Sequence, residues 1–165
     1  MPGKMNQLST NHEPMNSPTA VAMVGLGALG LPMAINLRRA GYRLNVHTRS
    51  RLAESSAELV DDQGPRVISS SSPNEAVHGC AVLVICVSDD AAVEAVLWGD
   101  GGAGYALTPG SLVIDCSTIA PATAAAMAKR LSERNVHYID APVTGGTEGA
   151  KAGTLTVLCG GETKA

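Results

Sequence analysis

A chain of 165 residues with 45% hydrophobic residues is long enough for one domain with a single buried core. Its formal net charge of −3 and pI near 5.7 argue against a general nucleic-acid or acidic-membrane surface, because such surfaces need clustered positive charge. No apolar run approaches the roughly 20 residues of a membrane span and no secretory signal is evident, so we expect a cytoplasmic protein without membrane or nucleic-acid partners.

The first 18 residues differ in character from the rest of the chain. They are rich in Asn, Ser, Pro and Met and show no hydrophobic periodicity. Such a segment buries too little apolar surface to order itself. We therefore expect a disordered tail over residues 1–18 and one folded domain over residues 19–165.

The folded part begins with a strand, a tight turn and a helix. Residues 19–24 form a short apolar run rich in Val and Ala, and residues 29–40 carry apolar side chains at helical spacing. Between them, Gly25, Gly27 and Gly30 have the G-x-G-x-x-G spacing. In dinucleotide-binding turns the first glycine permits the turn, the second lets the backbone approach a pyrophosphate, and the third lets the helix pack on the strand. The alternative is a structural turn that binds no ligand.

The rest of the chain alternates strands with helices. This alternation predicts an α/β fold of the Rossmann type, with a doubly wound, mainly parallel sheet and helices on both faces. Ligands of such folds bind at the carboxyl ends of the strands. We expect strands over residues 42–48, 66–69, 81–87, 111–115 and 136–141, helices over 50–62, 73–77, 88–98 and 121–134, and a loop over 99–104.

The second strand carries the residues that bear on cofactor choice. Enzymes that use NAD place an acidic residue about 20 positions after the glycines, where it hydrogen-bonds the adenosine ribose. Here Thr48 stands near that position, and Arg49 and Arg51 follow it. Arginines pair with phosphate through forked hydrogen bonds. NADP is therefore favoured, with NAD as the alternative; the arginines are also compatible with a solvated helix start.

Cysteine and histidine spacing indicates no metal site. The cysteines include no C-x-x-C pair and three of them lie in or beside expected buried strands, which favours a role as small core residues. The histidines show no ligand spacing either. The residues concerned are Cys80, Cys86, Cys116 and Cys159, and His12, His47, His78 and His137.

A glycine-rich segment follows the last expected strand. Residues 140–161 open with DAPVTGGTEGAKAGTL, which combines paired glycines with a hydroxyl group. Such a loop can present backbone N–H groups to a carboxylate, or it can simply connect elements. Physical reasoning alone leaves both open.

Three ordered motifs together resemble the β-hydroxyacid dehydrogenases, the group that includes 3-hydroxyisobutyrate dehydrogenase and tartronate semialdehyde reductase and is related to 6-phosphogluconate dehydrogenase. The motifs are GLGALGLPMAINLRRAG at 25–41, DCSTIAP at 115–121 and DAPVTGG at 140–146, and the match runs from about residue 19 to 161. The resemblance implies cofactor-binding residues Gly25, Leu26, Gly27, Ala28, Leu29, Val87, Ser88 and Thr118, and substrate-binding residues Thr144, Gly145 and Gly146. The spacing arguments above add Gly30, Thr48 and Arg49 to the expected cofactor-binding residues.

The resemblance also implies what the chain does. Members reduce or oxidise a small hydroxyacid substrate and often carry Ser where this chain has Thr144, so the substrate's size is left open. Their catalytic lysine lies on a helix beyond the end of this chain, and the helical domain that follows builds their homo-oligomers. We accordingly expect an NAD(P)-binding domain of a β-hydroxyacid oxidoreductase, inactive alone, with Lys129, Lys151 and Lys164 as surface residues. The alternatives are a non-catalytic dinucleotide-binding or scaffold module, and a structural α/β domain without a ligand.

Overall fold

The structure is a computed structural model, and it describes residues 20–49, 59 and 64–161. The expected tail and, apart from the helical and fully buried Leu59, the expected helix over 50–62 lie outside the described residues. The strands are β1 (Ala20–Val24), β2 (Arg43–His47), β3 (Val67–Ser69), β4 (Val82–Ile85), β5 (Leu112–Asp115), β6 (His137–Asp140), β7 (Val143–Thr144), β8 (Thr156–Val157) and β9 (Gly160–Gly161). The helices are α1 (Gly30–Arg39), α3 (Pro73–Ala76), α4 (Asp90–Trp98), the short 3-10 helix η2 (Ala103–Tyr105), α5 (Pro121–Ser132) and α6 (Gly146–Ala152).

Seven strands form one sheet in the order β3-β2-β1-β4-β5-β6-β9. The first six run parallel, and β9 pairs antiparallel with β6. The strand order reverses between β1 and β4, because β2 and β3 lie on one side of β1 and the later strands on the other. The predicted doubly wound, mainly parallel α/β fold is thereby confirmed, and its switch point lies at the carboxyl ends of β1 and β4.

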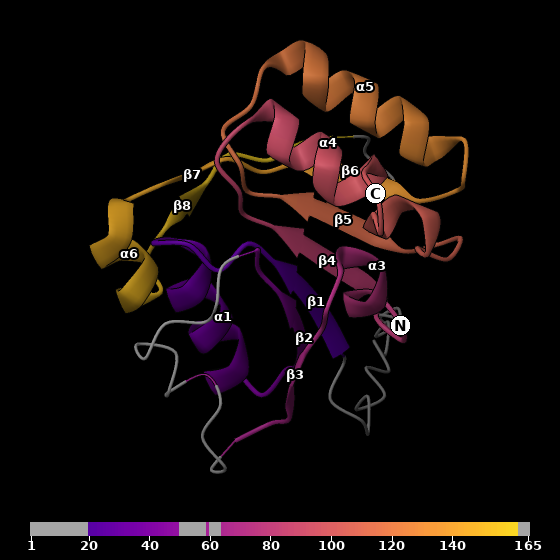
Figure 1. The fold of residues 1–165 in the computed structure, drawn as a ribbon. Coiled ribbons are helices and arrows are strands. Elements are labelled where there is room, and N and C mark those ends of the chain that lie inside the picture. Colours follow the sequence, from indigo (N-terminus) through magenta and orange to yellow (C-terminus); the bar gives the residue numbers. More distant parts are fainter. Residues whose placement is uncertain (1–19, 50–58, 60–63, 162–165) are drawn as a thin grey trace, which may run out of the picture.

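Helices cover both faces of this sheet, with α4 and α5 on one face and α1 and α6 on the other (Figure 1). Alternate residues of β1 enter the two cores, as the period of two in a strand requires. Ala22 and Val24 pack in the core beneath α4 and α5, whereas Val21 and Met23 pack in the core that includes Ala34 of α1. All four are at most 5% exposed, which explains why the sequence of β1 is apolar without alternation.

Helix α1 buries Gly30, Ala34 and Arg38, and its larger apolar side chains are partly buried against the same core. The two small residues let the helix come close to the strands. Arg38 is only 6% exposed, and its Nε donates a hydrogen bond to the carbonyl oxygen of Pro65 at 3.1 Å. The apolar spacing alone did not predict this burial, because an arginine in a last helical turn is also suited to solvent.

The segment after β6 holds more regular structure than the expected loop. Short strands β7 and β8 pair with each other, and α6 lies between them in sequence. Gly153 ends α6 in the left-handed conformation with φ of 69°. Asn36 of α1 donates its side-chain amide to the carbonyl oxygen of Ala150 at 2.7 Å, which ties α6 to α1. Glycine-rich composition concealed this helix from sequence analysis, since glycine has low helix propensity.

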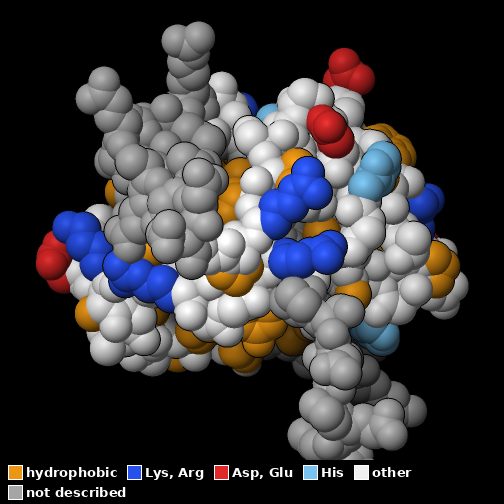
Figure 2. Space-filling model, turned by 90° about the horizontal axis from the view of Figure 1, so that it is seen from below, with side chains coloured by type: hydrophobic (Ala, Val, Ile, Leu, Met, Phe, Trp, Pro, Cys, Tyr) orange, Lys and Arg blue, Asp and Glu red, His pale blue; other side chains and the backbone are white. Residues whose placement is uncertain are grey.

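On the face shown in Figure 2, basic residues lie in separate groups. Figure 2, seen from below, shows Lys and Arg side chains divided by uncharged and apolar surface. Among helices of the described ranges, none combines the length and apolar character that a bilayer span requires.

The turn between β1 and α1 is packed at backbone level. Gly25 has a φ of 93°, and a β-carbon there would overlap the carbonyl oxygen of Cys86 beyond β4. A β-carbon on Gly30 would overlap the carbonyl oxygen of Gly25. By contrast, nothing lies within 4 Å of the position that a β-carbon on Gly27 would take.

We therefore predict that Gly30→Ala lowers the free energy of unfolding by about 1–3 kcal/mol, because the added methyl forces the turn away from its helix. Gly27→Ala is the matched control, and we expect its free energy of unfolding to stay within about 0.5 kcal/mol of the parent chain. Urea denaturation followed by circular dichroism measures both. Equal losses for the two variants would contradict the packing described here.

Candidate functional site

A cleft of about 570 Å³ lies at the switch point of the sheet. Ten of the eleven residues expected to bind the cofactor line it, namely Gly25, Leu26, Gly27, Ala28, Leu29, Gly30, Thr48, Arg49, Val87 and Ser88. They come from the ends of β1, β2 and β4, so residues as far apart in the chain as Gly25 and Ser88 meet in one place. The structure thus brings together a set that the sequence could only suggest.

The glycine turn forms the floor of this cleft. Helix α1 begins after Leu29 with no side-chain cap and with no acidic residue in its first turn. No capping side chain therefore accepts a hydrogen bond from the first N–H groups of α1. In α4, by contrast, the Asp89 side chain accepts such a bond. Together with the open space beside Gly27, this arrangement fits a pyrophosphate, which would accept from backbone N–H groups and benefit from the helix dipole.

The wall on the β2 side contains His47, Thr48 and Arg49. The His47 carbonyl oxygen accepts from the Gly25 N–H at 2.9 Å, which joins this wall to the glycine turn. The His47 Nδ1 lies 3.0 Å from the carbonyl oxygen of Ser70. Arg49 is exposed at the rim of the cleft.

The wall on the β4 side is the turn of Val87 and Ser88. Ser88 Oγ donates to Asp89 at 2.6 Å, and the other Asp89 oxygen accepts from the Ala92 N–H at 2.9 Å. These two hydrogen bonds, and to a smaller degree the charge of Arg49, hold the pKa of Asp89 below its usual range. Asp89 therefore stays a carboxylate that fixes the turn.

Thr118 does not line the cleft, although it was expected near the cofactor. It is exposed on the turn after β5. That turn is anchored at its far end, because Asp90 accepts from the Ala120 N–H at 3.0 Å. The pKa of Asp90 is lowered by hydrogen bonds from the Thr123 hydroxyl and the Ala120 N–H. The role of Thr118 toward a cofactor stays a prediction.

The expected substrate residues Thr144, Gly145 and Gly146 are exposed on the turn between β7 and α6. Both glycines have positive φ, at 129° and 62°. In Figure 1 this segment lies on the side of the sheet toward which the β4 and β5 arrows point. It leads from the end of β6 to the side of α1, so it runs along the same edge as the cleft.

Sequence reasoning missed several residues of the cleft. His47 and Cys86 lie inside the predicted strands, each directly before a predicted site residue, so extending the predicted site by one position toward the N-terminus at each strand end would have found them. The helix-borne and loop-borne members gave no comparable signal, because they are far from the glycines in sequence. The additional lining residues are Val24, His47, Pro73, Cys86, Ala92, Ala95, Val96 and Asp100.

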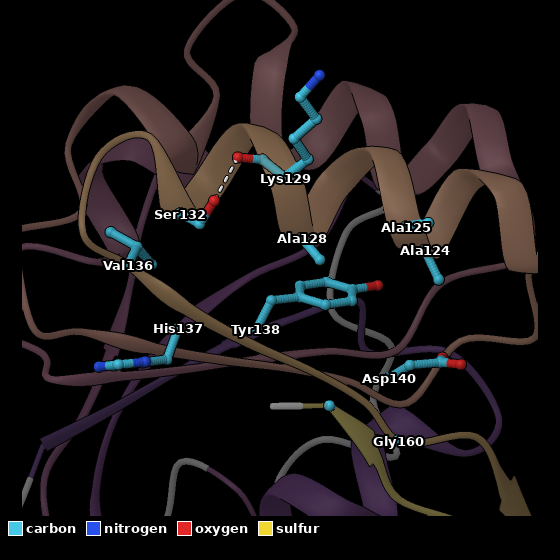
Figure 3. Close-up of a pocket in the computed structure, with 11 residues that line it drawn as sticks. Ala124, Ala125, Ala128, Lys129, Ser132, Val136, His137, Tyr138, Asp140 and Gly160 are labelled. Atoms are coloured by element: carbon cyan, nitrogen blue, oxygen red, sulfur yellow. Dashed lines mark hydrogen bonds between the residues drawn. The ribbon is translucent and has the colours of Figure 1, made fainter. Parts of the chain in front are cut away.

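A second cavity of about 510 Å³ lies between α5 and the strands β6 and β9. Figure 3 shows Tyr138 beneath the alanines of α5, and Lys129 pointing away from the cavity. Small residues dominate its α5 side. This position agrees with the interpretation of Lys129 as a surface residue.

The cysteines occupy different environments. Cys80 and Cys116 are buried, Cys86 is half-buried in the cleft wall, and Cys159 is exposed. Burial, with a smaller contribution from Cys86, raises the pKa of Cys116 to about 12. Within the described ranges, no three His, Cys, Asp or Glu side chains come together in a way that would hold a metal ion.

Comparison with known proteins shows which family and which enzymes the chain resembles. Residues 20–165 match the family described as the NAD binding domain of 6-phosphogluconate dehydrogenase. The NAD-dependent L-serine dehydrogenase of Pseudomonas aeruginosa is 40% identical over 145 residues, which cover 88% of this chain and 47% of that protein. The chain spans about half the length of the curated relatives it matches.

Solved structures show the same relationship. 3-Hydroxyisobutyrate dehydrogenase of Mycobacterium tuberculosis with L-serine matches with a TM-score of 0.79 and 30% identity, covering 90% of this chain and 48% of that one. Psf3 in complex with NADP+ and 2-OPP matches with a TM-score of 0.77 and 30% identity, covering 87% and 49% of the two chains. The similar proteins thus include one named for NAD and one bound to NADP+.

We predict that Gly27→Ala weakens binding of NADPH at least about tenfold, or ~1.4 kcal/mol, because its methyl would occupy the open space beside the turn. Isothermal titration calorimetry measures the change. The folded control is the same variant's unfolding curve, which should match the parent. Unchanged affinity would mean that the turn does not approach the ligand.

We also predict that iodoacetamide at pH 8 labels Cys159 well before Cys116. With a pKa of about 12, Cys116 is a thiolate in only roughly 10⁻⁴ of molecules at that pH, and only the thiolate reacts. Peptide mass spectrometry after a short pulse reads out each site, and all four cysteines should react in denaturant. Labelling of native Cys116 at the rate of Cys159 would contradict its burial.

Proposed function

The chain belongs to the family of the NAD-binding domain of 6-phosphogluconate dehydrogenase, in agreement with the resemblance of its motifs, and we propose that it binds a nicotinamide dinucleotide in the cleft at the switch point. In the whole protein this domain would serve an oxidoreductase acting on a small β-hydroxyacid or its semialdehyde. The observation that carries the proposal is the glycine turn, where open space at Gly27 meets a helix start without a side-chain cap. The dinucleotide, when bound, supplies the hydride chemistry.

The two sides of the cleft would hold the two halves of the dinucleotide. Dinucleotides lie across the point where the strand order reverses, with the pyrophosphate at the helix start. Thr48 and Arg49 would then face the adenosine half, and Val87 and Ser88 the nicotinamide half. Thr118, on the next strand, would lie beyond the nicotinamide toward the substrate.

Arg49 supports NADP rather than NAD as the cofactor. It stands at the rim of the cleft where an NAD-binding site would carry an acid. Its guanidinium can form a forked pair with a 2′-phosphate. Its neighbour Thr48 can hydrogen-bond the ribose but brings no charge that would repel that phosphate.

We further propose that Thr144, Gly145 and Gly146 hold the substrate's carboxylate. Their turn is exposed, and its positive φ angles are those that expose successive backbone N–H groups to an anion. The Thr144 hydroxyl adds one side-chain donor. Its methyl group narrows the space beside that donor, which favours a small acid.

We assign no described residue the role of general acid or base. Lys151 is the described lysine nearest in sequence to the carboxylate turn, and its Nζ lies 2.9 Å from Glu148 on the exposed side of α6. Lys129 points away from its cavity (Figure 3). Both fit surface roles.

The test of the proposal is cofactor binding by the chain itself. We expect NADPH to bind more tightly than NADH in calorimetric titrations at constant ionic strength. Binding of neither dinucleotide would overturn the proposed function.

Arg49→Ala tests the choice between the two cofactors. We expect it to weaken NADPH by about 1–3 kcal/mol and to leave NADH nearly unchanged, since only NADPH offers a 2′-phosphate to a charge-assisted pair. Arg43→Ala is the matched control, because Arg43 is an exposed arginine at the opposite end of the same strand. Equal losses for NADPH and NADH would contradict the assignment of Arg49.

A further inference from the structure

Asp115, the last residue of β5, is a fully buried carboxyl group with 0% exposure. Both of its oxygens accept hydrogen bonds. Oδ1 accepts from the Ser117 N–H at 3.0 Å, and Oδ2 accepts from the Tyr138 hydroxyl at 2.9 Å. Burying a carboxylate costs several kcal/mol unless such donors surround it, and an apolar residue is often at least as stabilising at a buried position. Packing alone therefore does not explain an acid here.

One arm of this network reaches the cleft. The Ser117 hydroxyl, on a residue that is 2% exposed, accepts from the Val87 N–H at 3.0 Å. The ladder between β4 and β5 ends at Ile85 and Asp115, and Cys116 adds one further bond to Ile85. Val87 lies beyond that ladder, so the Ser117 side chain takes the place of a ladder partner. It fixes the backbone that forms one wall of the cleft.

The other arm reaches the strand that leads to the carboxylate turn. Tyr138 lies beneath α5, and its hydroxyl points in the direction of Asp140, toward the end of β6 (Figure 3). The carbonyl oxygen of Asp115 also accepts from the Ala141 N–H at 2.8 Å. Asp115 thus bonds to β6 through both its side chain and its main chain.

The surroundings of Asp115 change the pKa values of two neighbouring groups. Burial, followed by the charge of Asp115, raises the pKa of Tyr138 above its ordinary value, so its hydroxyl remains a donor at neutral pH. Burial and the same charge also raise the pKa of Asp140. The charge of Asp115 therefore also affects Asp140, where the segment that leads to Thr144 begins.

We propose that Asp115 is a positioning residue which, through Ser117 and Tyr138, links the Val87 turn after β4 to β6 across the intervening strand β5 and so orients the nicotinamide half of the bound dinucleotide. This inference rests on the proposed function. It adds a role for three residues that touch neither half of the ligand directly. Their hydrogen bonds set the distance between the Val87–Ser88 wall of the cleft and the turn of Thr144, Gly145 and Gly146.

The experiment compares NADPH with 2′-phospho-ADP-ribose, which is the same molecule without nicotinamide. In Ser117→Ala the Val87 N–H loses its acceptor, so we expect NADPH to bind about 5- to 30-fold more weakly while 2′-phospho-ADP-ribose changes less than about twofold. The fluorescence of bound NADPH should shift toward that of free NADPH. Ser117→Thr keeps the hydroxyl. The ratio of its affinities for NADPH and 2′-phospho-ADP-ribose should therefore be close to that of the parent chain.

Tyr138→Phe removes one donor to Asp115 and keeps the ring, so it tests the same ratio should Ser117→Ala fail to fold. Met127→Ala is the matched control for stability, because Met127 is a 5% exposed core residue of α5 in the same cluster as Tyr138. It should lower the free energy of unfolding without changing the ratio of the two affinities.

The outcomes separate the two proposals. Failure of the parent chain to bind either ligand overturns the proposed function and this inference with it. The inference alone is overturned by a second outcome. In it the parent chain binds both ligands, and the ratio of the NADPH affinity to the 2′-phospho-ADP-ribose affinity is the same in Ser117→Ala and Tyr138→Phe as in Met127→Ala. A selective loss of NADPH affinity supports it.

Discussion

The close backbone approach of the β1–α1 turn to β4 is the constraint on which the rest of the structure depends. Two glycines leave no room for a β-carbon, Gly25 against the carbonyl of Cys86 and Gly30 against the carbonyl of Gly25. This approach seats α1 on the sheet and puts its first N–H groups at the switch point. Gly27 stands apart, because open space lies beside it. The three glycines of one motif therefore have separate roles, two in packing and one in leaving space for a ligand.

How far the sequence predicts the molecule depends on the range of the interactions that shape each part. The buried parallel strands, α1 and the glycine turn follow from local pattern, since apolar runs and glycine spacing act over a few residues. The cleft also needs strand ends that are far apart in the chain to meet. The burial of Arg38 and the helix α6 do not follow from local pattern. They depend on hydrogen bonds with residues far away in the sequence, namely the Pro65 carbonyl for Arg38 and the Asn36 side chain for α6. Thr118 shows the converse, since its motif is local but its exposed position depends on how Asp90 anchors the turn.

Asp89, Asp90 and Asp115 lie near the proposed ligand cleft without lining it, and their hydrogen bonds show how these acids are compatible with an anionic ligand. Asp89 and Asp90 accept from backbone N–H groups, and Asp115 accepts from Ser117 and Tyr138. Each carboxylate is thus held by donors of the protein. The charge of Arg49 makes a smaller contribution to the lowered pKa of Asp89. A bound phosphate would compete with Asp89 for Arg49. Arg49 would therefore contribute less to the binding free energy of the phosphate than an isolated guanidinium would.

Hydride transfer demands that donor and acceptor carbons approach to about 3–3.5 Å, and misplacement by 1 Å is costly. The described fold meets such a demand by building both proposed binding regions on one edge of a sheet. Neighbouring strands stand about 4.8 Å apart, so β6 lies roughly 10 Å from β4, and the chain after β6 then runs back to α1. Asp115 joins the strand ends and Asn36 joins α6 to α1. These hydrogen bonds connect the Val87–Ser88 wall of the cleft, across β5, with the segment that leads to Thr144, and they connect α6 with α1.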